Sequence, residues 1–187
     1  MDQSFSDISA KCKMQINLIN TLRKLWMEHV FWTRSFIIST AAGLGDLPYV
    51  TRRLLRNPGD FADVLRPLYG ADIAGRFSDL FTEHLTIAGS LVNNAKAGNT
   101  QAANEDRAKW YANANQIAAF LASINPYWSQ AEWQRLLYDH LKITETEAVE
   151  RLTDQYEKDV ALFDAIEDQA LMMADYMAAG IRKQFNI

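Results

Sequence analysis

Apolar residues recur at helical spacing along almost the whole chain, and this pattern restricts the possible folds more than any other feature. In the segment from about residue 6 to residue 42, apolar side chains at positions 18, 22, 25, 32 and 36 follow the helical period. The sequence contains no alternating strand pattern and no hairpin signal that would compete with this interpretation. The sequence therefore predicts an all-α fold.

Turn residues divide the helical pattern into segments. The first predicted helix, near 6–42, ends at the run GLGDLP, and two short helices follow, the second with Pro58 at its first helical position. The helical period returns near 72–97 and 100–124, on either side of a Gly-Asn stop signal. These boundaries are uncertain by roughly 2–4 residues, as is usual for helix ends predicted from sequence.

Two capping boxes predict further helix starts. In each box a hydroxyl side chain is followed three residues later by a glutamate: Ser129 by Glu132, and Thr144 by Glu147. The predicted helices are 129–142 and 144–185. Together the segments predict one domain over residues 1–187, an up-and-down bundle of about four long helices with short additional helices.

Charge and cysteine content limit the compartment and the partners. The net charge is -4, and no basic block interleaved with aromatic residues occurs, so we expect no nucleic-acid partner. Cys12 is the only cysteine, which excludes an intrachain disulfide and suits a reducing cytoplasm. The N-terminal residues lack a signal-peptide pattern, and no apolar run approaches the roughly 18 residues of a membrane span. We therefore expect a cytoplasmic protein without a membrane partner.

The three histidines are the first candidates for a functional site. His29 lies within roughly 20° of the centre of an apolar helix face, and His84 and His140 occupy the same kind of position on two other predicted helices. Facing helices of a bundle build internal sites from side chains that project inward. The sequence therefore predicts that the three imidazoles converge inside the bundle.

A carboxylate on the last predicted helix completes the candidate site. Glu167 and Asp159 fall about 40° from the centre of the inward apolar stripe. A buried charge without a partner costs several kcal/mol, so an inward carboxylate should be paired, protonated or bound to a metal. His29, His84, His140 and Glu167 form a plausible ligand set for a divalent first-row metal such as zinc, iron, manganese or nickel.

Other interpretations of the same residues remain open. The histidines can be hydrogen-bonded core groups in a structural or interaction module that binds no metal, or they can line a pocket for a small-molecule ligand. The sequence leaves open both a homodimer and an enzymatic activity. It has no Glu-x-x-His pair of the ferritin-like type, no Gly-rich phosphate loop and no His-Glu-x-x-His motif. No reaction class follows from it.

Two more polar residues lie close to apolar faces. Asn113 lies on the apolar face of its predicted helix, where it can line a pocket or bridge two helices by hydrogen bonds. Arg34 points about 140–160° away from His29, which predicts a surface or ion-pairing role.

Four blocks of the sequence resemble a family of uncharacterised bacterial all-helical proteins. They are LWMEHVFWTRSFIIST, EHLTIAGSLVNNAKAG, WYANANQIAAFLASINP and EDQALMMADYMAAGIRKQF. Proteins of this kind occur in Bacillus-like and Clostridium-like bacteria, and some bear the name acetylglutamate kinase. That kinase class is α/β and Gly-rich, whereas this sequence predicts neither property. The resemblance implies a cytosolic bundle and supplies no active site, although His29, His84, His140, Asp164 and Asp175 match positions of the family's blocks.

Overall fold

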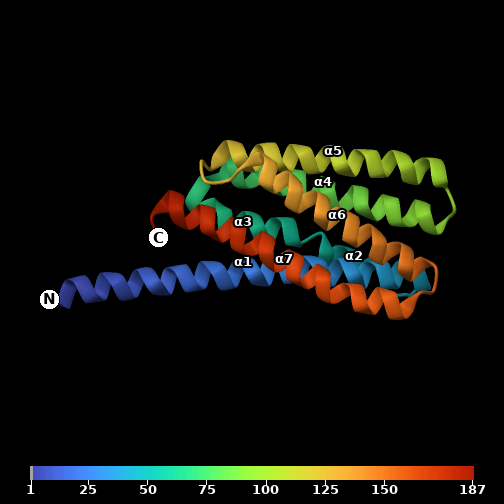
Figure 1. Ribbon diagram of the computed structural model, residues 1–187, viewed down its shortest axis with the longest axis horizontal. Coiled ribbons are helices and arrows are strands. Elements are labelled where there is room, and N and C mark those ends of the chain that lie inside the picture. Colours follow the sequence, from blue (N-terminus) through green and yellow to red (C-terminus); the bar gives the residue numbers. More distant parts are fainter. Residues whose placement is uncertain (1) are drawn as a thin grey trace.

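The computed structural model describes residues 2–187, with side chains from Ile8 onward (Figure 1). Its elements are α1 (Asp2–Ala42), α2 (Leu47–Leu54), α3 (Asn57–Tyr69), α4 (Ala71–Lys96), α5 (Thr100–Ile124), α6 (Gln130–Leu152) and α7 (Tyr156–Phe185). Every element in this part of the chain is an α-helix, so the all-α prediction is confirmed. None of these helices is long and apolar enough to cross a membrane.

The long helices alternate in direction, and this alternation positions the site. Helices α1, α4 and α6 run one way along the bundle, and α5 and α7 run the other way (Figure 1). Helices α4 and α5 form one antiparallel pair and α6 and α7 another, while α1 packs against α7 and the short α3 packs against α4. Residue numbers along α1, α4 and α6 therefore all increase toward the same end of the bundle.

The N-terminal part of α1 extends past the rest of the bundle (Figure 1). Its apolar side chains Ile8, Met14 and Ile16 are exposed, and so is Cys12. The buried face of α1 begins at Leu22, where the helix meets the other elements. The overhang ends close to the C-terminus, where the Lys11 side chain donates a hydrogen bond to Asn186.

One predicted helix boundary is wrong. Helix α6 does not end near residue 142 but continues through Thr144 and Glu147, both buried, to Leu152. The chain reverses after Leu152, where Asp154 has a positive φ of 61°. The Thr144 and Glu147 pattern misled the prediction because Glu147 pairs with an arginine of α1 instead of capping a helix. The predicted helix start at Ser129 is confirmed, since its hydroxyl accepts a hydrogen bond from the Glu132 N–H. The reciprocal bond of a capping box is not formed, because the Ser129 N–H donates to the Tyr176 hydroxyl.

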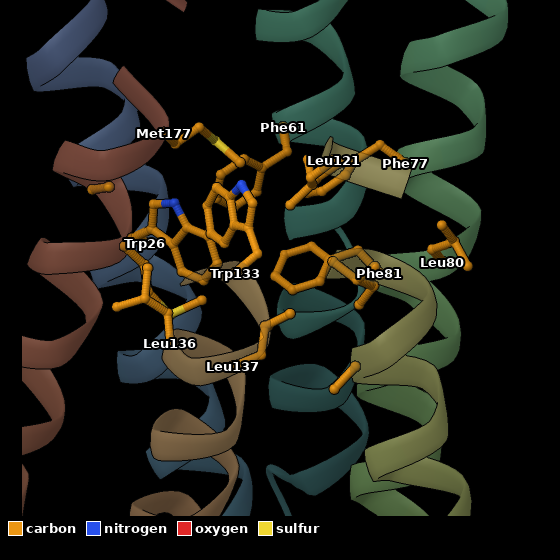
Figure 2. Packing of buried hydrophobic residues seen from close by; sticks show 14 of the residues in the cluster. Trp26, Phe61, Phe77, Leu80, Phe81, Leu121, Trp133, Leu136, Leu137 and Met177 are labelled. Carbon is orange, nitrogen blue, oxygen red and sulfur yellow. The ribbon is translucent and has the colours of Figure 1, made fainter. Parts of the chain in front are cut away.

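Aromatic side chains fill the bundle centre on one side of the histidines. Figure 2 shows Trp26, Phe61, Phe81 and Trp133 packed together between the helices. The Phe61 ring lies 5.3 Å from Trp26 and 5.4 Å from Phe81, centroid to centroid, in T-shaped contacts. Burial of each such side chain contributes roughly 1.5–3 kcal/mol, so this cluster is a large part of what holds the helices together.

Gly180 allows a close contact between α7 and the turn that precedes α6. A Cβ atom at this position would lie 1.9 Å from Nε1 of Trp128, which is far inside contact distance. The Trp128 indole N–H donates to the backbone oxygen of Tyr176, one turn earlier on α7. The glycine therefore lets the indole lie directly against the helix backbone.

Candidate functional site

His29 and His140 face each other in the bundle interior. Both side chains are almost completely buried, with 1% and 2% of their surface exposed, and their Nε2 atoms lie 3.3 Å apart. The first comes from α1 and the second from α6, so the prediction that inward histidines of different helices meet holds for this pair.

A glutamine on α7 determines which nitrogen of His140 carries the proton. The Gln169 amide N–H donates to the backbone oxygen of Leu136 over 2.8 Å, so the amide oxygen faces Nδ1 of His140 at 3.2 Å. Nδ1 of His140 must then donate, which leaves Nε2 with a lone pair. The His29 Nε2–H group supplies the matching donor. Nδ1 of His29 has no hydrogen-bond partner among the described residues.

His84 has a separate hydrogen-bond network. The Trp110 indole N–H donates to its Nε2 over 3.2 Å, and its Nδ1 lies 3.0 Å from the amide oxygen of Asn113. Because indole can only donate, Nε2 of His84 must accept and Nδ1 must carry the proton. The Asn113 amide N–H donates to the Leu80 carbonyl and to Glu83, so this residue bridges α4 and α5.

All three imidazoles are neutral at pH 7. Burial lowers the pKa of His84 to about 3 and that of His140 to about 4. Burial also lowers the pKa of His29 well below its ordinary value of 6.5. A neutral imidazole in an apolar surrounding needs partners for its donor and its acceptor. Asn113 and Trp110 supply both for His84, and Gln169 and His29 supply both for His140, whereas Nδ1 of His29 lacks a partner among the described residues.

The predicted four-residue metal site is not assembled. His84 makes no hydrogen bond to this pair, and the Phe81 ring packs against both His29 and His84 at 5.0 and 5.9 Å, centroid to centroid. Glu167 is half-buried and makes no hydrogen bond or ion pair within residues 8–187. Among the described residues, no group of three or more His, Cys, Asp or Glu side chains could hold a metal ion. Metal binding through this set has no support in the geometry.

A buried ion cluster lies toward the end of the bundle where α6 turns into α7. The Arg34 guanidinium reaches Glu147 at 2.5 Å and Asp159 at 2.6 Å, and Arg151 lies 3.4 Å from Asp159. Both carboxylate side chains are only 1% exposed. Burial raises the pKa of Glu147 to about 7, although hydrogen bonding and the charge of Arg34 act in the opposite direction.

The sequence predicted the positions of two members of this cluster, Arg34 and Asp159, but not that they pair with each other. Arg34 was expected to be a surface or ion-pairing residue, and the structure places it in ion pairs. Asp159 was expected close to the inward stripe, and it is fully buried. The role of Glu147 was missed, because its spacing from Thr144 matched a capping box.

A cavity of about 250 Å³ lies between the histidines and this end of the bundle. Five helices line it, α1, α2, α4, α5 and α6, and most of the lining is aliphatic or aromatic. Leu55 and Val149, which are exposed, form part of its rim, so the cavity reaches the surface. Its deeper wall includes Phe36, Leu85 and Trp110, which are buried.

The cavity lies about one helical turn from the histidines, none of which lines it. Thr33, Ala88 and Thr144 line it, and each lies four residues, about one helical turn, after one of the three histidines. Because α1, α4 and α6 run in the same direction, these three residues all lie toward the same end of the bundle relative to the histidines. Trp110 belongs to both regions, since it lines the cavity and donates to His84.

Two threonine hydroxyls in the cavity wall have no protein partner. The side chains of Thr33 and Thr144 are 8% and 4% exposed, and neither Oγ1 atom makes a hydrogen bond to a described residue. A helical threonine often donates to the carbonyl oxygen four residues earlier, as Thr86 does to Thr82. A buried hydroxyl without a partner costs about 1–3 kcal/mol, which makes this pair of groups unusual.

The ionic groups in the cavity lining are already paired. Arg107 and Glu145 both line the cavity, and the Arg107 Nε–H donates to the Glu145 carboxylate at 2.5 Å. The ion cluster around Arg34, whose members do not line the cavity, likewise combines two arginines with two carboxylates. The cavity therefore combines an apolar wall, two free hydroxyls and balanced charges.

Comparisons with protein-family models, with curated proteins and with solved structures found no match to this chain. The resemblance to a bacterial helical family therefore stays a prediction.

Proposed function

We propose that the protein is a binding module for a small, largely apolar molecule, which occupies the cavity between α1, α2, α4, α5 and α6. The observation that carries this proposal is the presence of two unpartnered threonine hydroxyls, Thr33 and Thr144, in the wall of a predominantly apolar cavity. Ligand sites in proteins have this composition: predominantly apolar walls with a few polar groups that fix orientation.

The size of the cavity limits the ligand. An apolar cavity of about 150 Å³ in another protein binds benzene, so the 250 Å³ available here suits a molecule of one or two rings or a short aliphatic chain. The hydrogen-bonded histidines lie behind the inner end of the site, where Trp110 joins the cavity to His84, and their neutral state keeps that region free of net charge.

Ligand-dependent stabilisation tests the proposal. Toluene and naphthalene serve as probes, and calorimetric titration together with thermal unfolding measures their binding. A ligand that binds only the folded state stabilises it by about 2.7 kcal/mol at a concentration of 100 Kd, which is a readily measured shift. Failure of the wild-type protein to bind either probe would contradict the proposal.

A filled cavity provides the matched control. Ala148 is buried and lines the cavity, so Ala148→Phe should occupy the space and abolish probe binding. Ala112 on α5 is exposed and does not line the cavity, so Ala112→Phe introduces the same side chain elsewhere and should leave binding unchanged. Equal binding by both variants would place the probe outside this cavity.

A further inference from the structure

We infer that the natural ligand is an uncharged molecule with an alcohol or phenol hydroxyl, which hydrogen-bonds to Thr33 and Thr144. This inference rests on the proposed function and specifies the chemical class of the ligand. It follows from three properties of the cavity: the positions of the two hydroxyls, the absence of their usual partners, and the balance of charge around them.

The two hydroxyls occupy equivalent positions on parallel helices. Thr33 follows His29 by four residues on α1, and Thr144 follows His140 by four residues on α6. The two histidines are in contact through their Nε2 atoms, and α1 packs against α6. The threonines therefore lie at the same level of the bundle, one turn beyond the histidine pair, and both line the cavity.

Each threonine hydroxyl offers both a donor and an acceptor. Neither Oγ1 donates to the helix backbone or accepts from a described side chain, so the hydrogen-bonding capacity of both groups is unused within the described residues. An alcohol or phenol oxygen also donates and accepts. Such a group can therefore accept from one threonine while it donates to the other, which a hydrocarbon cannot do.

The charges around the cavity disfavour an ionic ligand. Arg107 and Glu145 are the charged residues among those that line the cavity, and the Arg107 guanidinium is neutralised by Glu145. A carboxylate or ammonium group within the cavity would lose its water without gaining an unpaired counter-charge, and burial of such a group is strongly unfavourable. An uncharged hydroxyl avoids this cost.

Three probes that share one ring separate these contributions. Toluene supplies the apolar body alone, p-cresol adds a phenol hydroxyl, and 4-methylbenzoate adds a carboxylate. Calorimetric titration gives the affinity of each for the wild-type protein and for the double variant Thr33→Val with Thr144→Val. Valine has nearly the shape of threonine and removes only the hydroxyl, so the variant should fold.

We expect the ratio of p-cresol to toluene affinity to fall at least about fivefold in the double variant. The affinity for toluene should stay the same or rise, and 4-methylbenzoate should bind more weakly than p-cresol to the wild type. Thr146→Val is the matched control, because Thr146 also lies on α6 but outside the cavity, and its hydroxyl donates to the backbone oxygen of Lys142. That variant should keep the wild-type ratio, and serine at positions 33 and 144 should restore it.

The outcomes distinguish this inference from the proposed function. If toluene binds in the cavity but the affinity ratio is the same in the wild type and the double valine variant, the ligand class is wrong and the binding site stands. Tighter binding of 4-methylbenzoate than of p-cresol would also overturn the ligand class. If neither toluene nor p-cresol binds the wild type, the proposed function itself fails.

Discussion

Nε2 of His29 donates to Nε2 of His140 across 3.3 Å, so the two buried rings hold opposite tautomers. Gln169 fixes this arrangement from the far side of His140, since its oxygen accepts a hydrogen bond from the Nδ1–H group. The inward position of both rings follows from helical periodicity. The direction of the hydrogen bond between them follows from a glutamine on a third helix.

The tautomers give the first prediction. Long-range proton–nitrogen correlation spectra at pH 7 should show His84 and His140 protonated at Nδ1, and His29 protonated at Nε2. The volume-matched variant Gln169→Met removes the acceptor for His140 and should change the nitrogen shifts of His140 and His29 while leaving those of His84 in place. Three histidines with the same tautomer in the wild type would contradict the network.

The histidines also predict loss of stability in acid. Their pKa values in the folded state are lowered from 6.5, to about 3 for His84 and about 4 for His140. Between these values and pH 6.5 the unfolded chain binds more protons than the folded one, so stability rises with pH and reaches its full value above 6.5. Each such proton contributes up to about 1.4 kcal/mol per pH unit. Urea unfolding between pH 4 and 8 measures this slope, which His84→Gln should reduce.

Glu147 should act with the opposite sign. Its folded-state pKa is raised from 4.5 to about 7, so the folded protein binds the extra proton within this window and stability falls as pH rises. Glutamine at this position resembles the protonated acid and removes the dependence. The unfolding free energy of Glu147→Gln, relative to wild type, should therefore increase from pH 4.5 to pH 7. A constant difference across that window would show that Glu147 titrates at its ordinary pKa.

The ion cluster should be sensitive to loss of its central cation. Arg34→Met leaves Glu147 and Asp159 buried with only Arg151 nearby, and removal of one partner from a buried ion pair costs about 3–5 kcal/mol. Denaturant unfolding at pH 8 measures the loss. Arg135 forms ion pairs on the surface of α6, so Arg135→Met should have little effect. A similar small effect of both changes would show that the buried cluster contributes little to stability.

A pair of glycine substitutions tests the contact of Trp128 with α7. Alanine usually favours a helix over glycine by about 0.5–1 kcal/mol, and Gly75 on α4 has open space around it, so Gly75→Ala should stabilise the protein. Gly180→Ala should instead destabilise it by about 1–3 kcal/mol, because the new methyl group would overlap the Trp128 ring. Thermal unfolding of the two variants should give shifts of opposite sign.

Periodicity in the sequence was sufficient to predict the helices and the inward direction of the histidines, because both depend on local spacing. It could not identify their partners, which depend on the helices that lie opposite. On α7 the prediction selected Glu167 for its charge, whereas the residue that reaches His140 is the neutral Gln169, two positions later. The position of Gln169, three residues after the buried Ile166, was the available signal.

The cavity had no signature in the sequence. It forms where small side chains such as Ala88, Gly89 and Ala148 come from two helices that are distant in sequence, and the resulting space depends on how closely those helices pack. The local sequence pattern could not predict where α6 ends either, because Thr144 and Glu147 fit a helix start as well as they fit the buried interior of a helix. The ion pair of Glu147 with Arg34 on α1 distinguishes the buried interior from the helix start.

The packing of α1 against α7 has a consequence for synthesis on the ribosome. Helix α1 is made before α7, yet Arg34 pairs with Asp159, 125 residues further along the chain. The antiparallel pair of α4 and α5 can form as soon as both have left the exit tunnel, because only a short turn joins them. The apolar face of α1 that meets α7 stays uncovered until the final helix emerges. During that interval the nascent chain exposes an apolar surface that can aggregate. We therefore expect the protein to need a chaperone at this stage rather than in the finished bundle.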